Sequence, residues 1–134
     1  MKKRDALLLA PEAPYPVVGG GPARTASLVE YLGRRYALDV IVFREPGGPD
    51  PARVFPAGLV RAIHRLELPY HSRSPAARAA RNFERFLRGR PPLVDRFSGF
   101  EDEIERCLSG PGYVLALVEH FWCAPYARCL AAHA

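Results

Sequence analysis

Three short, mainly apolar runs dominate the hydrophobic pattern of the chain. They cover residues 5–11, 38–43 and 113–118, and proline, glycine or charged residues adjoin them. Runs of this length are typical of strands that are buried on both faces of a parallel sheet. A fourth segment, residues 59–66, alternates in polarity as a partly exposed edge strand does. The pattern therefore predicts four strands.

Helical periodicity fills the spaces between these strands. We expect helices at residues 22–34, at residues 76–88, after Ser98 and from about Ala124. Pro22 suits the first helical position, where its missing N–H is not needed, and Gly33 suits a helix end. Ser98 is placed to cap the third helix, whose first turn is acidic over residues 101–103.

This order of elements predicts an α/β fold with one domain over residues 1–134, because strands that alternate with helices build a mostly parallel sheet. We expect a Rossmann-like sheet of strand order 3-2-1-4 with helices on both faces, since right-handed crossovers place the strands in that order. The winding then reverses between strands 1 and 4. Ligands of such sheets bind at the carboxyl ends of the strands at that point.

Gly19, Gly20 and Gly21 connect the first strand to its helix at this switch point. Backbone without a Cβ can approach a phosphate or sugar oxygen, and the helix that follows offers free N–H groups and a positive dipole end. With Arg24, they are the candidate ligand-binding residues. A plain strand-to-helix turn is the alternative, because the third glycine of a dinucleotide fingerprint is missing.

Glu119 and His120 follow the last strand and emerge at the same place. A histidine there can act as a hydrogen-bond donor or general base near neutral pH. Neighbouring residues of a strand point to opposite faces, so we expect only one of the two to enter the cleft. They are the candidate catalytic residues, and a structural histidine beside aromatic packing is the alternative for His120. The spacing of Cys107, Cys123 and Cys129 is not that of a metal site, and we expect no cofactor.

Composition narrows the choice of partners. The chain carries a net charge of +5, and a single arginine-rich segment, residues 73–96, accounts for it. Neither an aromatic-studded basic surface nor a known nucleic-acid-binding pattern accompanies that segment, so we expect no nucleic-acid partner. The apolar run near the N-terminus is too short for a signal peptide or a membrane span, and three cysteines fit a reducing compartment. We therefore expect a cytoplasmic protein.

The helix at residues 76–88 is strongly amphipathic, with alanine, phenylalanine and leucine opposite Arg78, Arg81, Arg85 and Arg88. Two interpretations stay open. The apolar stripe packs on the sheet in the ordinary way, or the helix docks on an anionic lipid surface and makes the protein membrane-peripheral.

The residues around the switch point also resemble a known family. The segment Ala6-Leu-Leu-Leu-Ala-Pro-Glu-Ala-Pro-Tyr-Pro, the glycines followed by Arg24, and Val118-Glu-His-Phe-Trp-Cys-Ala-Pro-Tyr126 look like the N-terminal domain of GT-B glycosyltransferases of family 4. The resemblance implies half of a GT-B fold, the acceptor side of a retaining enzyme that moves a sugar from a nucleotide-sugar donor. The glycine loop would approach the donor phosphate or the acceptor. Glu119 or His120 would touch the transferred sugar.

The chain departs from the family where a second domain would hold the nucleotide. The family's E-x7-E motif and the last strands of its N-terminal domain are not found in this sequence. We therefore expect a truncated half-enzyme that is inactive alone, with an unknown acceptor. The alternative is a non-catalytic Rossmann-like module that binds a nucleotide or another phosphorylated ligand. With the family's next strand missing, the fourth strand should be an exposed edge through which homodimers form.

Overall fold

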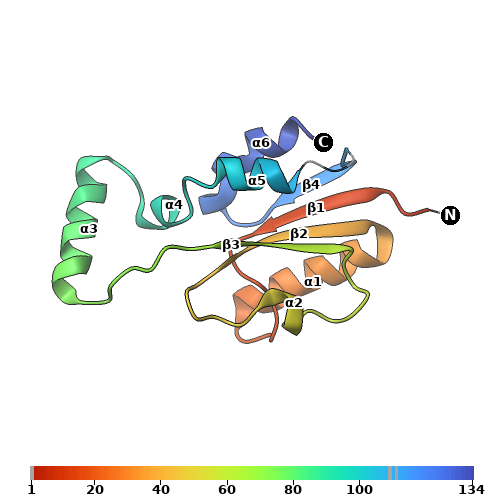
Figure 1. Ribbon diagram of the computed structural model, residues 1–134, viewed down its shortest axis with the longest axis horizontal. Helices are drawn as coiled ribbons and strands as arrows, with labels where there is room; N and C mark the ends of the chain where they lie inside the picture. Colours follow the sequence, from red (N-terminus) through yellow and green to blue (C-terminus); the bar gives the residue numbers. More distant parts are fainter. Residues whose placement is uncertain (1, 109, 111) are drawn as a thin grey trace.

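The computed structural model describes residues 2–108, 110 and 112–134, and its centre is a four-stranded parallel sheet. The strands, in chain order, are β1 (Asp5–Ala10), β2 (Ala37–Arg44), β3 (Ala62–Glu67) and β4 (Leu115–Val118). They lie in the order β3-β2-β1-β4, and every pairing is parallel (Figure 1). The predicted α/β, Rossmann-like architecture is confirmed.

The two faces of the sheet bury alternate side chains, as strand geometry requires. Leu8 of β1 packs on one face with α1 (Gly20–Arg35) and with Phe55, which follows α2 (Pro51–Val54). Its neighbours Leu7 and Leu9 pack on the other face, where α5, the 3₁₀ helix η1 and α6 lie. These elements span Glu101–Cys107, Phe121–Tyr126 and Ala127–Ala131, respectively. Helices thus cover both faces, and β1 and β2 are buried between them.

Several predicted boundaries shift. The first helix begins at Gly20 and continues to Arg35, past Gly33. A glycine is needed at position 33 because a Cβ there would lie 2.3 Å from the carbonyl oxygen of Leu59. Ser98 does not cap the third helix: its hydroxyl donates to the carbonyl of Asp95 and closes the preceding turn. The third strand begins three residues later than predicted and is an edge strand, as expected.

A polar cluster joins all four strands at the amino edge of the sheet. The carboxylate of Asp39 in β2 accepts two hydrogen bonds from Arg61, at 2.8 and 2.6 Å, and one of 2.8 Å from the hydroxyl of Tyr113. Arg61 also donates to Asp5 in β1 at 2.6 Å. Burial opposes ionisation of Asp39, but the hydrogen bonds from Arg61 and Tyr113 outweigh it, so the pKa of Asp39 is lowered. Sequence reasoning missed this cluster because Asp39 lies inside an apolar run.

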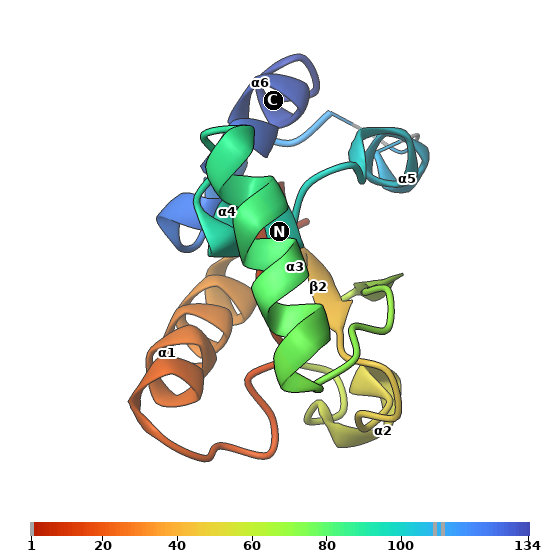
Figure 2. The ribbon, with the colours of Figure 1, turned by 90° about the vertical axis from the view of Figure 1, so that its left-hand side faces the viewer.

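The amphipathic helix α3 (Pro75–Leu87) does not pack its apolar stripe on the sheet, so that expectation was wrong. The helix lies beyond the carboxyl edge of the sheet and crosses in front of it (Figure 2). Phe83, Phe86 and Leu87 are 64%, 79% and 67% exposed, while Arg81 and Arg85 are at least partly buried. The polar face is therefore the one that α3 turns toward the rest of the chain.

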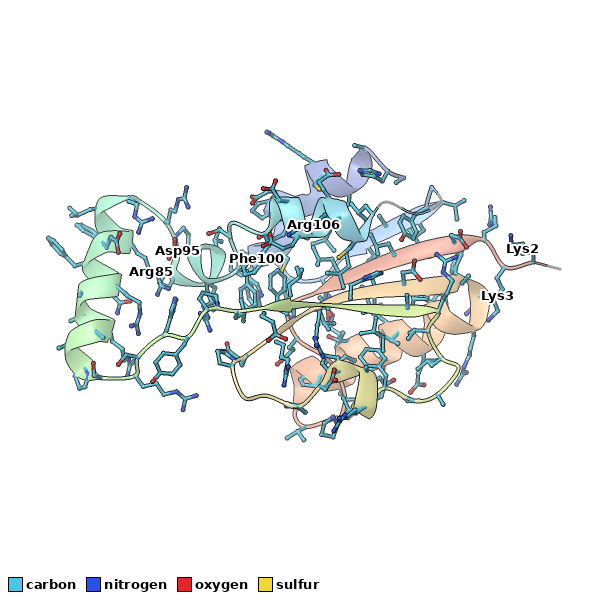
Figure 3. The ribbon with its side chains drawn as sticks, viewed as in Figure 1. Lys2, Lys3, Arg85, Asp95, Phe100 and Arg106 are labelled. Carbon is cyan, nitrogen blue, oxygen red and sulfur yellow. The ribbon has the colours of Figure 1, made fainter. Side chains whose placement is uncertain are left out.

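An ion pair holds α3 in this orientation. Arg85 donates from Nε to the Asp95 carboxylate at 2.8 Å, and Asp95 belongs to α4 (Pro92–Arg96). Figure 3 shows the two side chains between the helices. Both are largely buried, so solvent screens the pair less than it screens a surface pair. Glu84 and Arg88 form an i,i+4 ion pair at 2.5 Å on the exposed side of the helix.

The fourth strand lies at an edge of the sheet, and within the described residues it pairs only with β1. Because unpaired N–H and C=O groups on an edge strand invite pairing with another chain, we expect the protein to dimerise or aggregate through β4 as its concentration rises. Light scattering over a concentration series measures this. A constant monomer mass at the highest concentration would contradict the prediction.

Candidate functional site

The carboxyl ends of β1 and β4 bring the predicted site residues together. Leu9 of β1 lies opposite Val118 of β4, and the N–H of Glu119 continues the pairing by donating to the carbonyl of Leu9 at 2.8 Å. The chain leaves β1 at the same edge and enters α1. The glycine turn and Glu119 are thus neighbours at the point where the winding of the sheet reverses.

The turn into α1 is built on Gly19. Its φ of 86° is a conformation that favours glycine, whereas Gly20 and Gly21 already belong to the helix. The positive φ of this turn thus lies at Gly19 and not at Gly20 or Gly21. Within the described residues no side chain caps α1, and the first N–H groups of a helix have no acceptor within it. The N–H groups of Gly20 and Gly21 can consequently donate to a ligand.

Glu119 is a buried carboxylate with only one hydrogen-bonded oxygen. The residue is 3% exposed, and Thr25 of α1 donates from its hydroxyl to Oε2. Oε1 has no hydrogen-bond partner in the described part of the chain. The nearest positive charge is the Arg24 guanidinium, whose Nε lies 3.8 Å from Oε1 on a side chain that is 72% exposed. Such a pair is too solvated to compensate for a buried charge.

His120 lies against the same carboxylate oxygen. Its Nε2 is 3.9 Å from Oε1 of Glu119, and its ring stacks on Trp122 with the ring centroids 4.3 Å apart. The backbone at His120 has a φ of 67°, which is uncommon for a residue with a side chain and marks a strained position. Strand β4 ends at Val118, so the alternation of side chains between the two faces of a strand does not apply to Glu119 and His120. Both side chains consequently lie at the site, contrary to the expectation that only one would.

Two further residues of the site were missed from the sequence. Thr25 is 1% exposed and connects the glycine turn to Glu119, since its hydroxyl also lies 3.3 Å from the carbonyl oxygen of Gly21. A polar residue inside the apolar stripe of α1 was a signal that could have found it. Trp122 supports His120, and its buried indole nitrogen also has no hydrogen-bond partner in the part of the chain that the structure describes. No feature of the sequence indicated that role.

An open cavity of about 280 Å³ adjoins the start of α1. Glu12, Tyr15, Pro22, Phe43 and Glu45 are among the residues that line it. Its lining combines carboxylates with aromatic rings. Such a lining suits a polyhydroxylated ligand, because sugar hydroxyls bond to carboxylates and the C–H faces of sugars pack on rings. A second cavity, of about 230 Å³, shares Glu12 and Glu45 and is also lined by Trp122.

The site offers hydrogen bonding and charge rather than a metal or a thiol nucleophile. Within the described residues, no three His, Cys, Asp or Glu side chains group as metal ligands, and no helix is both long and apolar enough to cross a bilayer. Burial raises the pKa of Cys123 to about 12, so that thiol stays protonated. Glu119 can accept a proton or a hydroxyl hydrogen, and Arg24 and the glycine N–H groups can bind an anion.

The chain was also compared with known proteins. No family model, no curated protein and no solved structure matches it, so the assignment of this site depends on its own geometry.

Proposed function

We propose that the chain is the acceptor-side domain of a retaining glycosyltransferase with a GT-B fold, of the family 4 kind that its sequence resembles. The observation that supports this most is that Oε1 of Glu119 has no hydrogen-bond partner among the described residues, because a buried carboxylate oxygen without a hydrogen bond costs free energy unless a ligand supplies one. A sugar hydroxyl is a donor of the right kind. The strand order gives the fold-level support.

Each site residue has a role in this proposal. Glu119 accepts a hydroxyl of the transferred sugar or of the acceptor, and His120 lies beside it as a second hydrogen-bonding group. The N–H groups of Gly20 and Gly21 approach the donor phosphate, with Arg24 adding positive charge one turn further along α1. The nucleotide of the donor would be bound mainly by a second domain.

A second candidate is a self-sufficient, non-catalytic module that binds a nucleotide or another phosphorylated ligand. The free N-terminus of α1 favours it, since that feature binds phosphate without any transfer chemistry. The two candidates differ in affinity. A few hydrogen bonds of about 0.5–1.5 kcal/mol each barely exceed an association cost of at least about 4 kcal/mol, so a half-site binds a free nucleotide sugar weakly.

Calorimetry and NMR titration with UDP-, GDP- and ADP-sugars test the proposal on the chain as it is. We expect affinities weaker than about 1 mM, with amide shifts confined to Gly20, Gly21 and the residues around Glu119. Gly21→Val should abolish those shifts, because a side chain blocks the approach to the backbone. A Cβ there would meet only Oε1 of Glu12, at 3.6 Å, so the variant should fold normally.

Ala23→Val is the matched control, since it adds the same side chain to an exposed position of the same helical turn. It should leave the amide shifts in place. Micromolar affinity for any of the nucleotide sugars would refute the half-enzyme and favour the self-sufficient module. Saturating sugar without any shift at the glycine turn would contradict both candidates.

A further inference from the structure

The inverted orientation of α3 creates a basic pocket at the carboxyl edge of the sheet. Because the helix turns its arginine face inward, Arg78 and Arg81 face the segment that follows β3 rather than solvent alone. The resulting cavity has a volume of about 370 Å³. It is lined by Glu45, His71, Arg73, Arg78, Arg81 and Arg96.

The charges that line this pocket are unbalanced. It holds four arginines and one carboxylate, that of Glu45, which is already paired with Arg96 at 2.7 Å. Burial and the neighbouring charges of Arg96 and Arg81 lower the pKa of His71, so its imidazole is neutral near pH 7 and the surplus charge belongs to the guanidinium groups. Like charges held together in one cavity repel each other unless an anion joins them.

Among the described residues, two of these arginines bond to the chain, and the other two can bind a ligand. Arg81 donates to the carbonyl of Ser72 and Arg96 to the carbonyl of Pro69, each at 2.7 Å. These bonds use only part of the five N–H donors of each guanidinium. Within the described residues, the side chains of Arg73 and Arg78 have neither a hydrogen bond nor an ion pair, although both line the pocket. A structural role therefore accounts for Arg81 and Arg96 but not for Arg73 and Arg78.

We propose that this pocket binds a phosphoryl group of the acceptor, so that the sugar acceptor is a phosphorylated molecule. The planar guanidinium group matches phosphate oxygens with paired N–H donors, and several such groups around one cavity suit a dianion or a pyrophosphate. That this phosphorylated molecule is the sugar acceptor rests on the transfer function proposed above. The binding of a phosphoryl group in the pocket does not depend on that function.

The position of the pocket fits that role. Glu45 follows β2 and lines both the basic pocket and the two cavities that reach Tyr15, Glu12 and Trp122. The three cavities thus lie around one residue at the carboxyl edge, on the side where Glu119 emerges. A ligand anchored by its phosphate among the arginines would extend its remaining part along this edge toward the candidate site.

Titration with inorganic phosphate and pyrophosphate measures the binding directly, by calorimetry and by the ring resonances of His71. We expect the wild-type chain to bind pyrophosphate more tightly than phosphate, with shifts at His71 but not at His64 or His133. The double variant Arg73→Gln/Arg78→Gln should bind at least about tenfold more weakly, because it removes two charge-assisted donors. It should fold normally, since both residues are exposed.

Arg53→Gln/Arg128→Gln is the matched control. It removes the same charge from exposed positions of α2 and α6 and should bind like the wild type. Sedimentation with phosphatidic acid vesicles identifies the source of the phosphoryl group. Vesicle binding that needs Arg73 and Arg78 indicates a lipid headgroup, and pyrophosphate binding without vesicle binding indicates a soluble acceptor. Absence of phosphate and pyrophosphate binding, or equal binding by the two double variants, would overturn the proposal whatever the result with nucleotide sugars.

Discussion

Replacing Asp39 by alanine should lower the free energy of unfolding by about 2–3 kcal/mol, because it removes a buried carboxylate that accepts three hydrogen bonds, although Arg61 keeps its ion pair with Asp5. The Asp39 side chain is 7% exposed, and its carboxylate accepts hydrogen bonds from both Arg61 and Tyr113. The variant leaves the hydroxyl of Tyr113 buried without that acceptor. Urea unfolding followed by circular dichroism measures the loss.

Glu84→Ala is the control for this experiment. This variant also breaks a short ion pair with an arginine, but the side chains of Glu84 and Arg88 are both about half exposed or more. We expect a change within about 0.5 kcal/mol, since solvent screens an exposed pair. An equal loss in the two variants would show that burial of the Asp39 cluster contributes nothing.

The same cluster predicts a pH dependence. The pKa of Asp39 in the folded state lies below its ordinary value of 3.8, so its ionisation stabilises the fold above that pH, and this contribution is lost as the pH falls through the folded-state pKa. We expect the wild-type free energy of unfolding to fall below about pH 4 more steeply than that of the Asp39→Ala variant. Parallel pH curves for the wild type and the Asp39→Ala variant would contradict the assignment of this dependence to Asp39. Some slope should remain, because the pKa of Asp95 is lowered as well.

Thr25→Val should lower the free energy of unfolding by about 2–3 kcal/mol, although valine has nearly the shape of threonine. The hydroxyl of Thr25 is the only hydrogen-bond donor to the Glu119 carboxylate within the described residues. Its removal leaves a charge that is 3% exposed with no hydrogen bond at all. Thermal and urea unfolding of the variant measure this loss.

A double-mutant cycle with Glu119→Gln isolates the cause. Glutamine keeps an oxygen for Thr25 and removes the buried charge, so this variant alone should stay within about 1 kcal/mol of the wild type. In its background, Thr25→Val should cost clearly less. An equal loss of unfolding free energy from Thr25→Val in the two backgrounds would mean that the Glu119 carboxylate does not cause the destabilisation. Glu119→Gln should also remove the sugar-dependent shifts at the glycine turn while it leaves the fold intact.

The local pattern of apolar and polar residues was enough to predict the sheet and the position of the candidate site residues on it. Apolar runs and helical periodicity found β1, β2 and β4, and the alternation of elements gave the strand order 3-2-1-4. That order alone implied that Gly19–Gly21 and Glu119 would emerge at one edge, where the structure has them. Boundaries were wrong by one to three residues, because capping and close approaches such as Gly33 against Leu59 involve partners distant in sequence.

The direction in which α3 turns its two faces could not be read from its sequence. Its periodicity is that of a helix with its apolar stripe packed inward, yet the pairing of Arg85 with Asp95 turns the arginines inward and leaves Phe83 and Phe86 in solvent. An amphipathic sequence shows only that the two faces of a helix differ in polarity. Which face meets the rest of the chain depends on contacts with α4 and with the segment after β3.

The sequence by itself determined the fold class, the winding of the sheet and the edge at which the candidate site lies, because hydrophobic period and the handedness of crossovers are local and general rules. Only the tertiary structure decided which polar groups are satisfied. It shows that Thr25 bonds to Glu119, that Asp39 holds together the amino edge, and that Arg73 and Arg78 line a pocket in which neither has an ion pair with a described residue. Burial and pairing are properties of residues brought together from distant parts of the chain, and the spacing of residues along it does not encode them.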